Sequence, residues 1–170
     1  DYQSKGVDDV ARLSSKGVRR IIFQLATGGG KTVVFSALAQ RFISRIDKKE
    51  FICVHRHELL EQTVNALKKV AGINAGLLIA EYKTICQKVG DLYIPFNNAQ
   101  VVVCMIETLN NRIKKYSSLT DGVGMLIVDE VHLGNFVKIY AYFETQLIVG
   151  FSATPISANK KEPLKNHFDT

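Results

Sequence analysis

Short apolar runs alternate with longer amphipathic stretches along most of this chain. The short runs are almost continuously hydrophobic, which is typical of strands buried on both faces of a parallel sheet. In the stretches between them, apolar residues recur every three or four positions, the spacing of one face of a helix. We expect strands at 21–26, 51–55, 76–80, 100–104, 125–129 and 146–152, and helices at 31–46, 57–70 and 107–116.

This alternation of strands and helices predicts right-handed βαβ units. We therefore expect a three-layer α/β domain, in which a mostly parallel central sheet is flanked by helices. Residues 82–98 are the least regular part of the chain, and we expect "DLYIPFNNAQ", residues 91–100, to form a loop around Pro95. We assign residues 1–158 to the domain and the polar residues 159–170 to a tail or linker.

The composition narrows the classes of function that this chain can serve. No apolar run approaches the roughly 20 residues that a membrane-spanning helix needs, so we expect no membrane partner. The formal charge of +6 favours a polyanionic partner such as nucleic acid, although a solvated basic surface would give the same excess. The three cysteines show no CxxC spacing, which argues against a zinc site or a disulfide framework and fits an intracellular protein, cytoplasmic or in the nucleoid or nucleus.

The stretch "LATGGGKT" lies between an expected strand and an expected helix. A glycine run can form a flexible linker, but in this position it is typical of a loop whose backbone N–H groups bind phosphate at a helix N-terminus. Lys31 would then reach the β- and γ-phosphates, and the Thr32 hydroxyl would ligate Mg²⁺. Leu25 stands where the strict phosphate-loop pattern has its first glycine, which is a departure.

A pair of acids follows a second buried run, in "GMLIVDEVH". Asp129 and Glu130 come at the carboxyl end of the expected strand, the edge at which open α/β sheets bind ligands. Asp129 can hold Mg²⁺, while Glu130 can orient or deprotonate a water that attacks the γ-phosphate. Two solvated carboxylates at a strand end are the alternative. His132 is a candidate relay to the "SAT" segment, where Ser152 and Thr154 could also form no more than a local turn.

The order of these segments resembles a known family. "YQ", "ATGGGKT", "VHRHELLEQ", "VVVCMIETL", "LIVDEVH" and "GFSATP" are similar to the motifs of the first RecA-like domain of superfamily 2 helicases and translocases, the DEAD/DEAH-like group. They cover nearly the whole chain. The "HRHELLEQ" form is most similar to the branch of DNA repair and restriction-type translocases, which favours DNA over RNA as the partner.

The resemblance implies a RecA-like P-loop NTPase fold that uses ATP and Mg²⁺. Gln3 matches the glutamine that reads adenine, and Ser152 and Thr154 match the segment that couples the nucleotide state to strand movement. The DExH box, here a DEVH box, is matched by Asp129, Glu130 and His132. The nucleotide loop is matched by Thr27, Gly28, Gly29, Gly30, Lys31 and Thr32.

The resemblance also implies contacts to the nucleic-acid backbone. Arg56 and His57 fall in the first of the family's nucleic-acid segments. In the next such segment many relatives carry Thr or Ser where this chain has Met105, and Thr108 is the remaining candidate for a phosphate contact.

The function implied is that of a nucleic-acid-dependent ATPase which unwinds, or moves along, DNA or RNA. The family works with two RecA-like domains that bind ATP between them, so we expect a second domain outside these residues and weak activity without it. A double-strand DNA translocase of a restriction, repair or defence complex is one alternative. An ATP-gated binding module is another, although a pure switch has no need of Glu130.

Overall fold

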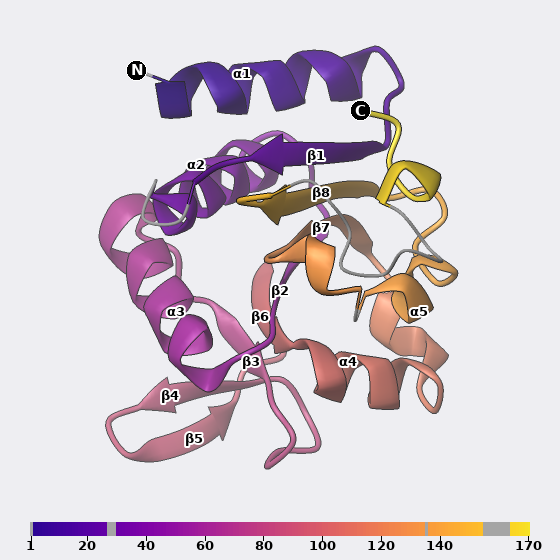
Figure 1. Cartoon of the computed structure of the whole chain (residues 1–170). Coiled ribbons are helices and arrows are strands. Elements are labelled where there is room, and N and C mark those ends of the chain that lie inside the picture. The colour runs from indigo at the N-terminus through magenta and orange to yellow at the C-terminus, as the bar shows by residue number, and fades with distance from the viewer. Residues whose placement is uncertain (1, 27–29, 135, 155–163) are drawn as a thin grey trace.

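The computed structural model describes residues 2–26, 30–134, 136–154 and 164–170 (Figure 1). A single sheet has the strand order β1-β8-β7-β2-β6-β3-β4-β5, and its six strands from β1 to β3 in that order pair in parallel. The strands are β1 (Arg20–Gln24), β2 (Lys49–Val54), β3 (Gly76–Leu78), β4 (Cys86–Val89), β5 (Leu92–Pro95), β6 (Val101–Met105), β7 (Val123–Val128) and β8 (Leu147–Ser152).

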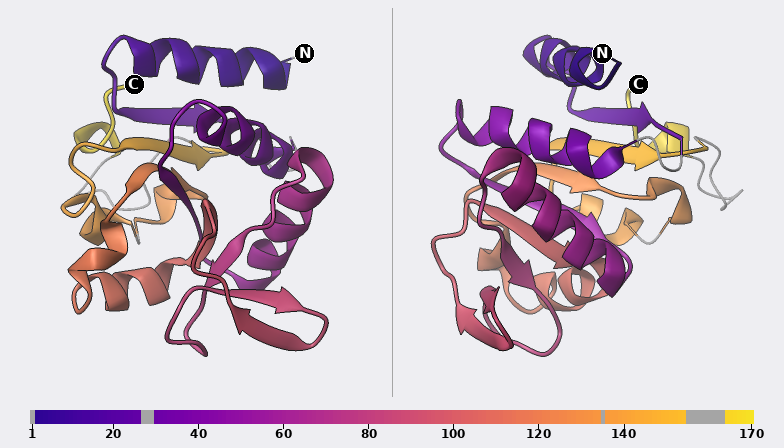
Figure 2. Two further views of the ribbon diagram at one scale, coloured as in Figure 1. Left: turned by 180° about the vertical axis from the view of Figure 1, so that it is seen from behind. Right: turned by 90° about the vertical axis from the view of Figure 1, so that its left-hand side faces the viewer.

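Helices cover both faces of the sheet (Figures 1 and 2). One face carries α1 (Tyr2–Ser15), α2 (Lys31–Ile43) and α3 (His57–Ala71), and the other carries α4 (Ile106–Ile113) and α5 (Val137–Tyr140). This arrangement confirms the predicted three-layer α/β domain. None of the helices in the described ranges combines the length and the apolar character that crossing a bilayer requires.

The alternation of side chains along the central strands supplies the core of both layers. In β2, Ile52 and Val54 belong to the apolar cluster beneath α1, α2 and α3, while Phe51 and Cys53 belong to the cluster beneath α4 and α5. All four are at most 1% exposed. Because both faces of the strand are buried, its sequence shows a continuous apolar run rather than an alternation.

The expectation of a loop at 91–100 is wrong in part, because Leu92–Pro95 forms the strand β5. This strand pairs with β4 in an antiparallel hairpin, in which Cys86 pairs with Pro95 and Val89 with Leu92. The hairpin extends the sheet at one edge, where its side chains are largely exposed. Pro95 led us to predict a loop. A proline can nevertheless occupy an edge strand, because no partner strand there needs its missing N–H group.

The N-terminal helix α1 was also absent from the predicted elements. Only Val7 and Val10 of this helix are buried, so its apolar stripe is too narrow to be recognised from periodicity alone. The helices that were predicted are present, and their ends differ by up to three residues, as for α2, which ends at Ile43 rather than at residue 46.

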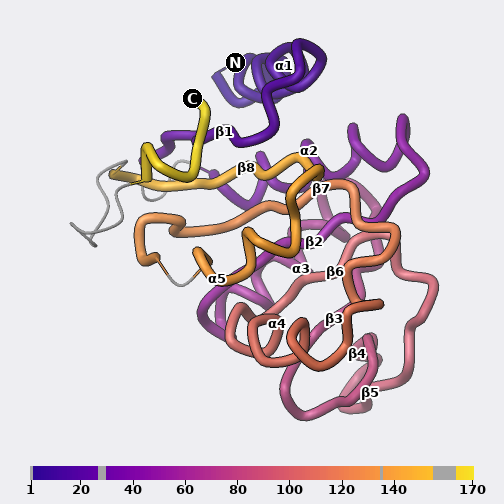
Figure 3. The backbone as a smooth tube through the Cα atoms, turned by 90° about the vertical axis from the view of Figure 1, so that its right-hand side faces the viewer, coloured from indigo at the N-terminus to yellow at the C-terminus, as the bar shows by residue number. Residues whose placement is uncertain are grey.

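The described C-terminal residues, 164–170, lie beside β1 (Figure 3). The N–H of Ile22 donates to the carbonyl oxygen of Thr170 at 2.6 Å, and the N–H of Asp169 donates to that of Arg20 at 2.8 Å. Phe168 lies over Gly150 of β8, where a Cβ would stand 2.8 Å from its ring. The division into a domain of 1–158 and a tail of 159–170 stays a prediction.

Glu50 is an acidic residue inside the core. It belongs to β2 between Val101 of β6 and Met125 of β7, and its side chain is fully buried. Neither carboxylate oxygen has a hydrogen-bond partner among the described residues. Burial therefore raises the pKa of Glu50 well above its usual range, because the charged form loses its hydration and gains nothing in return.

We expect Glu50→Gln to stabilise the protein at neutral and alkaline pH. Above the unfolded pKa of about 4.3 the folded state binds more protons at this carboxyl than the unfolded state, so stability falls as pH rises towards the folded pKa. Urea unfolding should show Glu50→Gln more stable by about 1–3 kcal/mol near pH 8, with the gap closing near pH 4. The exposed Glu144→Gln serves as the control. Equal pH dependence for the wild type and Glu50→Gln would contradict the prediction.

Candidate active site

The carboxyl ends of β1, β7 and β8 meet at one edge of the sheet. Gln24 at the end of β1 is paired with Ser152 at the end of β8, and the N–H of Leu25 donates to the carbonyl oxygen of Ser152 at 3.0 Å. Strand β7 pairs with β8 and ends one residue before Asp129. The register of three parallel strands therefore brings the chain segments before α2, after β7 and after β8 together.

Lys31 makes the central contacts of this edge. It is the first residue of α2, and its Nζ donates to Oε1 of Glu130 at 2.5 Å and lies 3.5 Å from Oδ1 of Asp129. The exposed fractions of the three side chains are 12%, 22% and 7% for Lys31, Glu130 and Asp129. Charges so poorly hydrated interact strongly, so Lys31 offsets the repulsion between the two acids.

Glu130 has a backbone conformation that side chains seldom adopt. Its φ of 50° and ψ of 48° place it in the left-handed region, the one such non-glycine residue in the described part of the chain. A conformation of this kind costs about 1–3 kcal/mol and persists only where its surroundings fix it. Here the Glu130 N–H donates to Oδ1 of Asp129 at 2.9 Å, and the carboxylate is held by Lys31.

Asp129 has a raised pKa. Burial is the largest cause and Glu130 adds to it, while the Lys31 ammonium, the Glu130 N–H and the nearby His55 act in the opposite direction. The backbone is fixed by a hydrogen bond from the Asp129 N–H to the carbonyl oxygen of Cys53, at 3.0 Å. A cation beside this carboxyl therefore favours its ionised form, the form that can ligate a metal.

A chain of polar contacts leads from Glu130 to the segment after β8. His132 Nδ1 lies 2.9 Å from the Ser152 hydroxyl and 3.3 Å from Oε2 of Glu130. The Ser152 hydroxyl donates to the carbonyl oxygen of Thr154 at 2.5 Å and accepts from the Thr154 N–H at 3.2 Å. Since that hydroxyl donates its one hydrogen to Thr154, Nδ1 of His132 is the donor to the Ser152 oxygen, and the Glu130 carboxylate lies beside the ring.

Gln3 lies against the start of α2. A Cβ on Gly30 would stand 2.3 Å from the Gln3 amide nitrogen, and Gly30 has a φ of 79°. This left-handed backbone conformation favours glycine at the position. The neighbouring Thr32 is half-buried and its carbonyl oxygen accepts from the Ser36 hydroxyl at 2.8 Å. The other predicted loop residues, Thr27, Gly28 and Gly29, lie outside the described residues.

The predicted nucleic-acid residues follow the next strands along the same edge. Arg56 and His57 are exposed after β2, where Arg56 is the N-cap of α3 and His57 Nε2 lies 4.0 Å from a Glu81 carboxylate oxygen. Thr108 on α4 is only 7% exposed, so its hydroxyl offers little surface to a phosphate in this conformation. Arg56 and His57 are therefore more accessible to a phosphate than Thr108.

Two residues near this edge were missed in the sequence. His55 follows β2 directly, its buried Nδ1 has no partner among the described residues, and its charge acts on Asp129. The position of His55 directly after a buried strand is the sequence signal that could have identified it. Arg112 on α4 donates to the carbonyl oxygens of Ile79 at 2.8 Å and of Tyr82, which holds the loop after β3. Nothing in the sequence points to that contact.

The residues present fit a magnesium nucleotide. The Lys31 ammonium lies between the two acids, which shows that the pair can hold positive charge. Among the described residues no group of three or more His, Cys, Asp or Glu could hold a metal by itself. Mg²⁺ needs no such cage, because it is usually bound through one or two carboxylates and the phosphates of its substrate.

Comparison with known proteins finds a matching family model and a similar yeast protein. The family model described as the type III restriction enzyme res subunit matches residues 1–157. A Saccharomyces cerevisiae protein named as an ATP-dependent helicase, IRC3, is 32% identical over 176 residues, which cover 95% of this chain and 24% of the yeast protein. The chain thus spans about a quarter of the length of that relative.

Solved structures share the fold. The helicase domain of Hef from Pyrococcus furiosus superposes with a TM-score of 0.74 at 18% identity, over 99% of this chain and 36% of that one. LlaGI, a type ISP restriction-modification enzyme solved with a DNA substrate mimic, superposes with a TM-score of 0.71 at 18% identity, over 95% of this chain and 18% of its own. These likenesses confirm the RecA-like fold.

We expect Lys31→Ala to destabilise the nucleotide-free protein at neutral pH. Removing the shared cation leaves two poorly hydrated carboxylates side by side, which should cost about 1–3 kcal/mol. Urea unfolding of the variant measures the loss, and adding Glu130→Gln to Lys31→Ala should recover part of it. Lys88→Ala, which removes an exposed ion pair with Glu61, is the control and should change stability by less than about 1 kcal/mol. Equal losses in the two single variants would contradict the role of the buried cluster.

Proposed function

Since the chain belongs to the family described as the type III restriction enzyme res subunit and is the ATP-hydrolysing first RecA-like domain of a superfamily 2 helicase, we propose that it couples ATP hydrolysis to movement along DNA. The observation that carries the proposal is the continuous contact from Lys31 through Glu130, His132 and Ser152 to Thr154. It connects the cation expected to bind phosphate with the residues that directly follow β8.

We assign ATP to the edge formed by β1, β7 and β8. Gln3 would bind the adenine, and a hollow of about 320 Å³ beside it, lined in part by Val33, Val34 and Ala37, offers apolar surface for the ring. Lys31 would bind the β- and γ-phosphates. Bound Mg²⁺, held through the Thr32 hydroxyl and the Asp129 carboxylate, would neutralise charge on the triphosphate.

In this proposal, nucleotide binding also frees the catalytic acid. Lys31 cannot keep its contact with Glu130 unchanged while it binds phosphate, so the triphosphate competes for the ammonium. Glu130 then orients a water and accepts its proton as the water oxygen bonds to the γ-phosphorus and the bond to the β-phosphate oxygen breaks. His132, whose Nδ1 lies 3.3 Å from Glu130 and hydrogen-bonds to the Ser152 hydroxyl, positions the carboxylate and links its change of partner to Ser152.

DNA is the polymer that we favour. The matching family is a restriction-enzyme subunit, the related fold of LlaGI was solved with a DNA substrate mimic, and this chain carries a charge of +6. Arg56 and His57 are exposed at the same edge as the nucleotide site, and we expect them to contact a phosphate backbone. The three buried free cysteines support an intracellular location.

A double-strand DNA translocase that does not unwind is the second candidate. The restriction-enzyme family favours it, whereas the yeast relative is named as a helicase. Both motors need a second RecA-like domain, whose arginine would supply about 10³–10⁵ of the rate in related ATPases. We therefore expect the 170-residue chain to bind ATP but to hydrolyse it slowly.

We expect Glu130→Gln to separate binding from hydrolysis. The variant keeps Lys31 and Asp129, so Mg-ATP affinity should stay within a few-fold of wild type, while single-turnover hydrolysis should fall by about 10²–10⁴ because the proton acceptor is lost. Lys31→Ala should lose binding itself. Fluorescence titration with a labelled ATP analogue and a quenched single-turnover assay measure the two steps. Wild-type hydrolysis by Glu130→Gln would refute the assigned base.

We expect Ser152→Ala to uncouple the polymer from the nucleotide site. In the chain joined to its second RecA-like domain, basal ATP turnover should change little, whereas stimulation by DNA should fall at least several-fold, because His132 and Thr154 lose their shared partner. Steady-state turnover with and without single-stranded DNA, duplex DNA and RNA measures this. Triplex displacement combined with a duplex-unwinding assay then distinguishes a translocase from a helicase. Equal stimulation of Ser152→Ala and wild type would show that the coupling runs elsewhere.

A further inference from the structure

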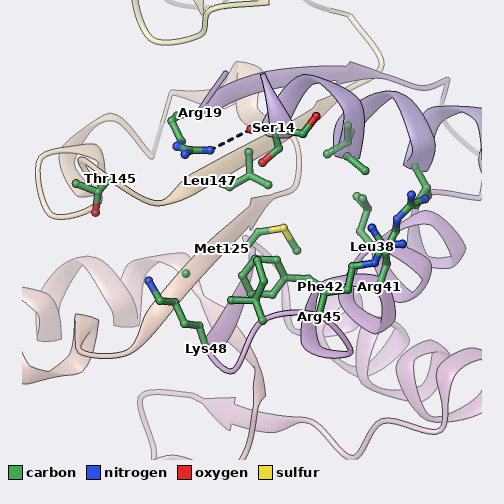
Figure 4. Close-up of a pocket in the computed structure, with 16 residues that line it drawn as sticks. Ser14, Arg19, Leu38, Arg41, Phe42, Arg45, Lys48, Met125, Thr145 and Leu147 are labelled. Atoms are coloured by element: carbon green, nitrogen blue, oxygen red, sulfur yellow. Dashed lines mark hydrogen bonds between the residues drawn. The ribbon is translucent and has the colours of Figure 1, made fainter. Parts of the chain in front are cut away.

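A groove of about 350 Å³ lies at the opposite edge of the sheet from the nucleotide site (Figure 4). It is bounded by α1, by the C-terminal half of α2 with the residues that follow it, and by the amino ends of β7 and β8. Because the strands are parallel, their amino ends lie a full strand length from the edge that holds Lys31 and Asp129. A ligand in this groove therefore leaves the nucleotide site and the exposed Arg56 and His57 free.

The floor of the groove is apolar. Leu38 and Phe42 of α2, Met125 of β7 and Leu147 of β8 lie together there (Figure 4). Phe42 and Lys48 pack closely against Gly124 of β7. A Cβ at that position would stand 2.9 Å from the Phe42 ring and 2.8 Å from Cδ of Lys48. The floor is wide enough for one large side chain.

The rim is cationic. Arg19, Arg41, Arg45 and Lys48 surround the floor, and no acidic residue is among those that line the groove. Arg19 donates to the carbonyl oxygen of Ser14 at 3.2 Å, and Arg41 pairs with Asp8, which lies outside the lining.

These cations have capacity left for a ligand. Arg45 and Lys48 are exposed, and neither side chain forms an ion pair with a described residue.

We propose that this groove docks an acidic segment of a partner protein, with a large apolar side chain on the floor and flanking carboxylates on the rim. An apolar anchor surrounded by a polar rim is the usual anatomy of a protein interface. A nucleic-acid backbone would use the cations but would leave the apolar floor without a partner, and free phosphate would do the same. The proposal does not depend on the nature of the motor.

The probe is a short fluorescent peptide in which a Phe-Leu pair is flanked by aspartates. Fluorescence anisotropy should show saturable binding to the chain, and replacing Phe-Leu by Ser-Ser should weaken it at least fivefold. Arg45→Glu with Lys48→Glu should weaken it at least tenfold, because both residues are exposed and lie on the rim. Lys114→Glu with Lys115→Glu makes the same charge change at exposed positions outside the groove and should have less than a twofold effect.

Urea unfolding of both double variants confirms that each is folded before binding is compared. Absence of saturable binding overturns the proposal, and so does equal affinity for the Phe-Leu and Ser-Ser peptides, which would reduce the groove to a basic patch. Equal weakening by the two double variants overturns it as well. Oligothymidylate is the competitor that tests for nucleic acid. If it displaced the peptide from the wild type but not from the variant with Arg45→Glu and Lys48→Glu, the groove would be assigned to nucleic acid instead.

Discussion

The ion cluster of Lys31 with Asp129 and Glu130 is the constraint around which this edge of the domain is organised. One ammonium serves two poorly hydrated acids, which neutralises a pair that would otherwise repel. The same contact holds Glu130 in a left-handed backbone conformation, from which its second oxygen faces His132. A triphosphate that attracts Lys31 must therefore disturb Glu130 and, through His132, the residues that follow β8.

The register of the strands brings the residues of this ion cluster together. Three parallel strands end side by side, and each contributes one component: β1 leads into the loop before Lys31, β7 into the acid pair, and β8 into Ser152. The helices bury both faces of the sheet, so that the residues at its carboxyl edge are supported by a rigid core. At the amino edge the same strands carry the cationic groove, which leaves one domain with two independent surfaces.

Most of this architecture was predictable because the buried strands are continuous apolar runs, and the site was predictable because glycine, lysine and paired acids follow those runs. The β4–β5 hairpin was missed since it is an exposed edge with mixed side chains, and α1 since only Val7 and Val10 are buried. The contact of Arg112 with the loop after β3, the approach of Gln3 to Gly30 and the φ of Glu130 all depend on tertiary geometry. No local sequence pattern encodes them.

The most direct test of the central claim observes the Lys31 ammonium itself. Lysine side-chain ¹⁵N NMR of the chain should show a slowly exchanging Lys31 NH₃⁺ resonance without nucleotide, and Glu130→Gln should shift it. Adding Mg-ATP should move the resonance of the wild type to a position that no longer depends on Glu130, because phosphate replaces the carboxylate as the partner. A Lys31 resonance that is the same in the wild type and in Glu130→Gln, or that ignores Mg-ATP, would contradict the claim that nucleotide and acid compete for one cation.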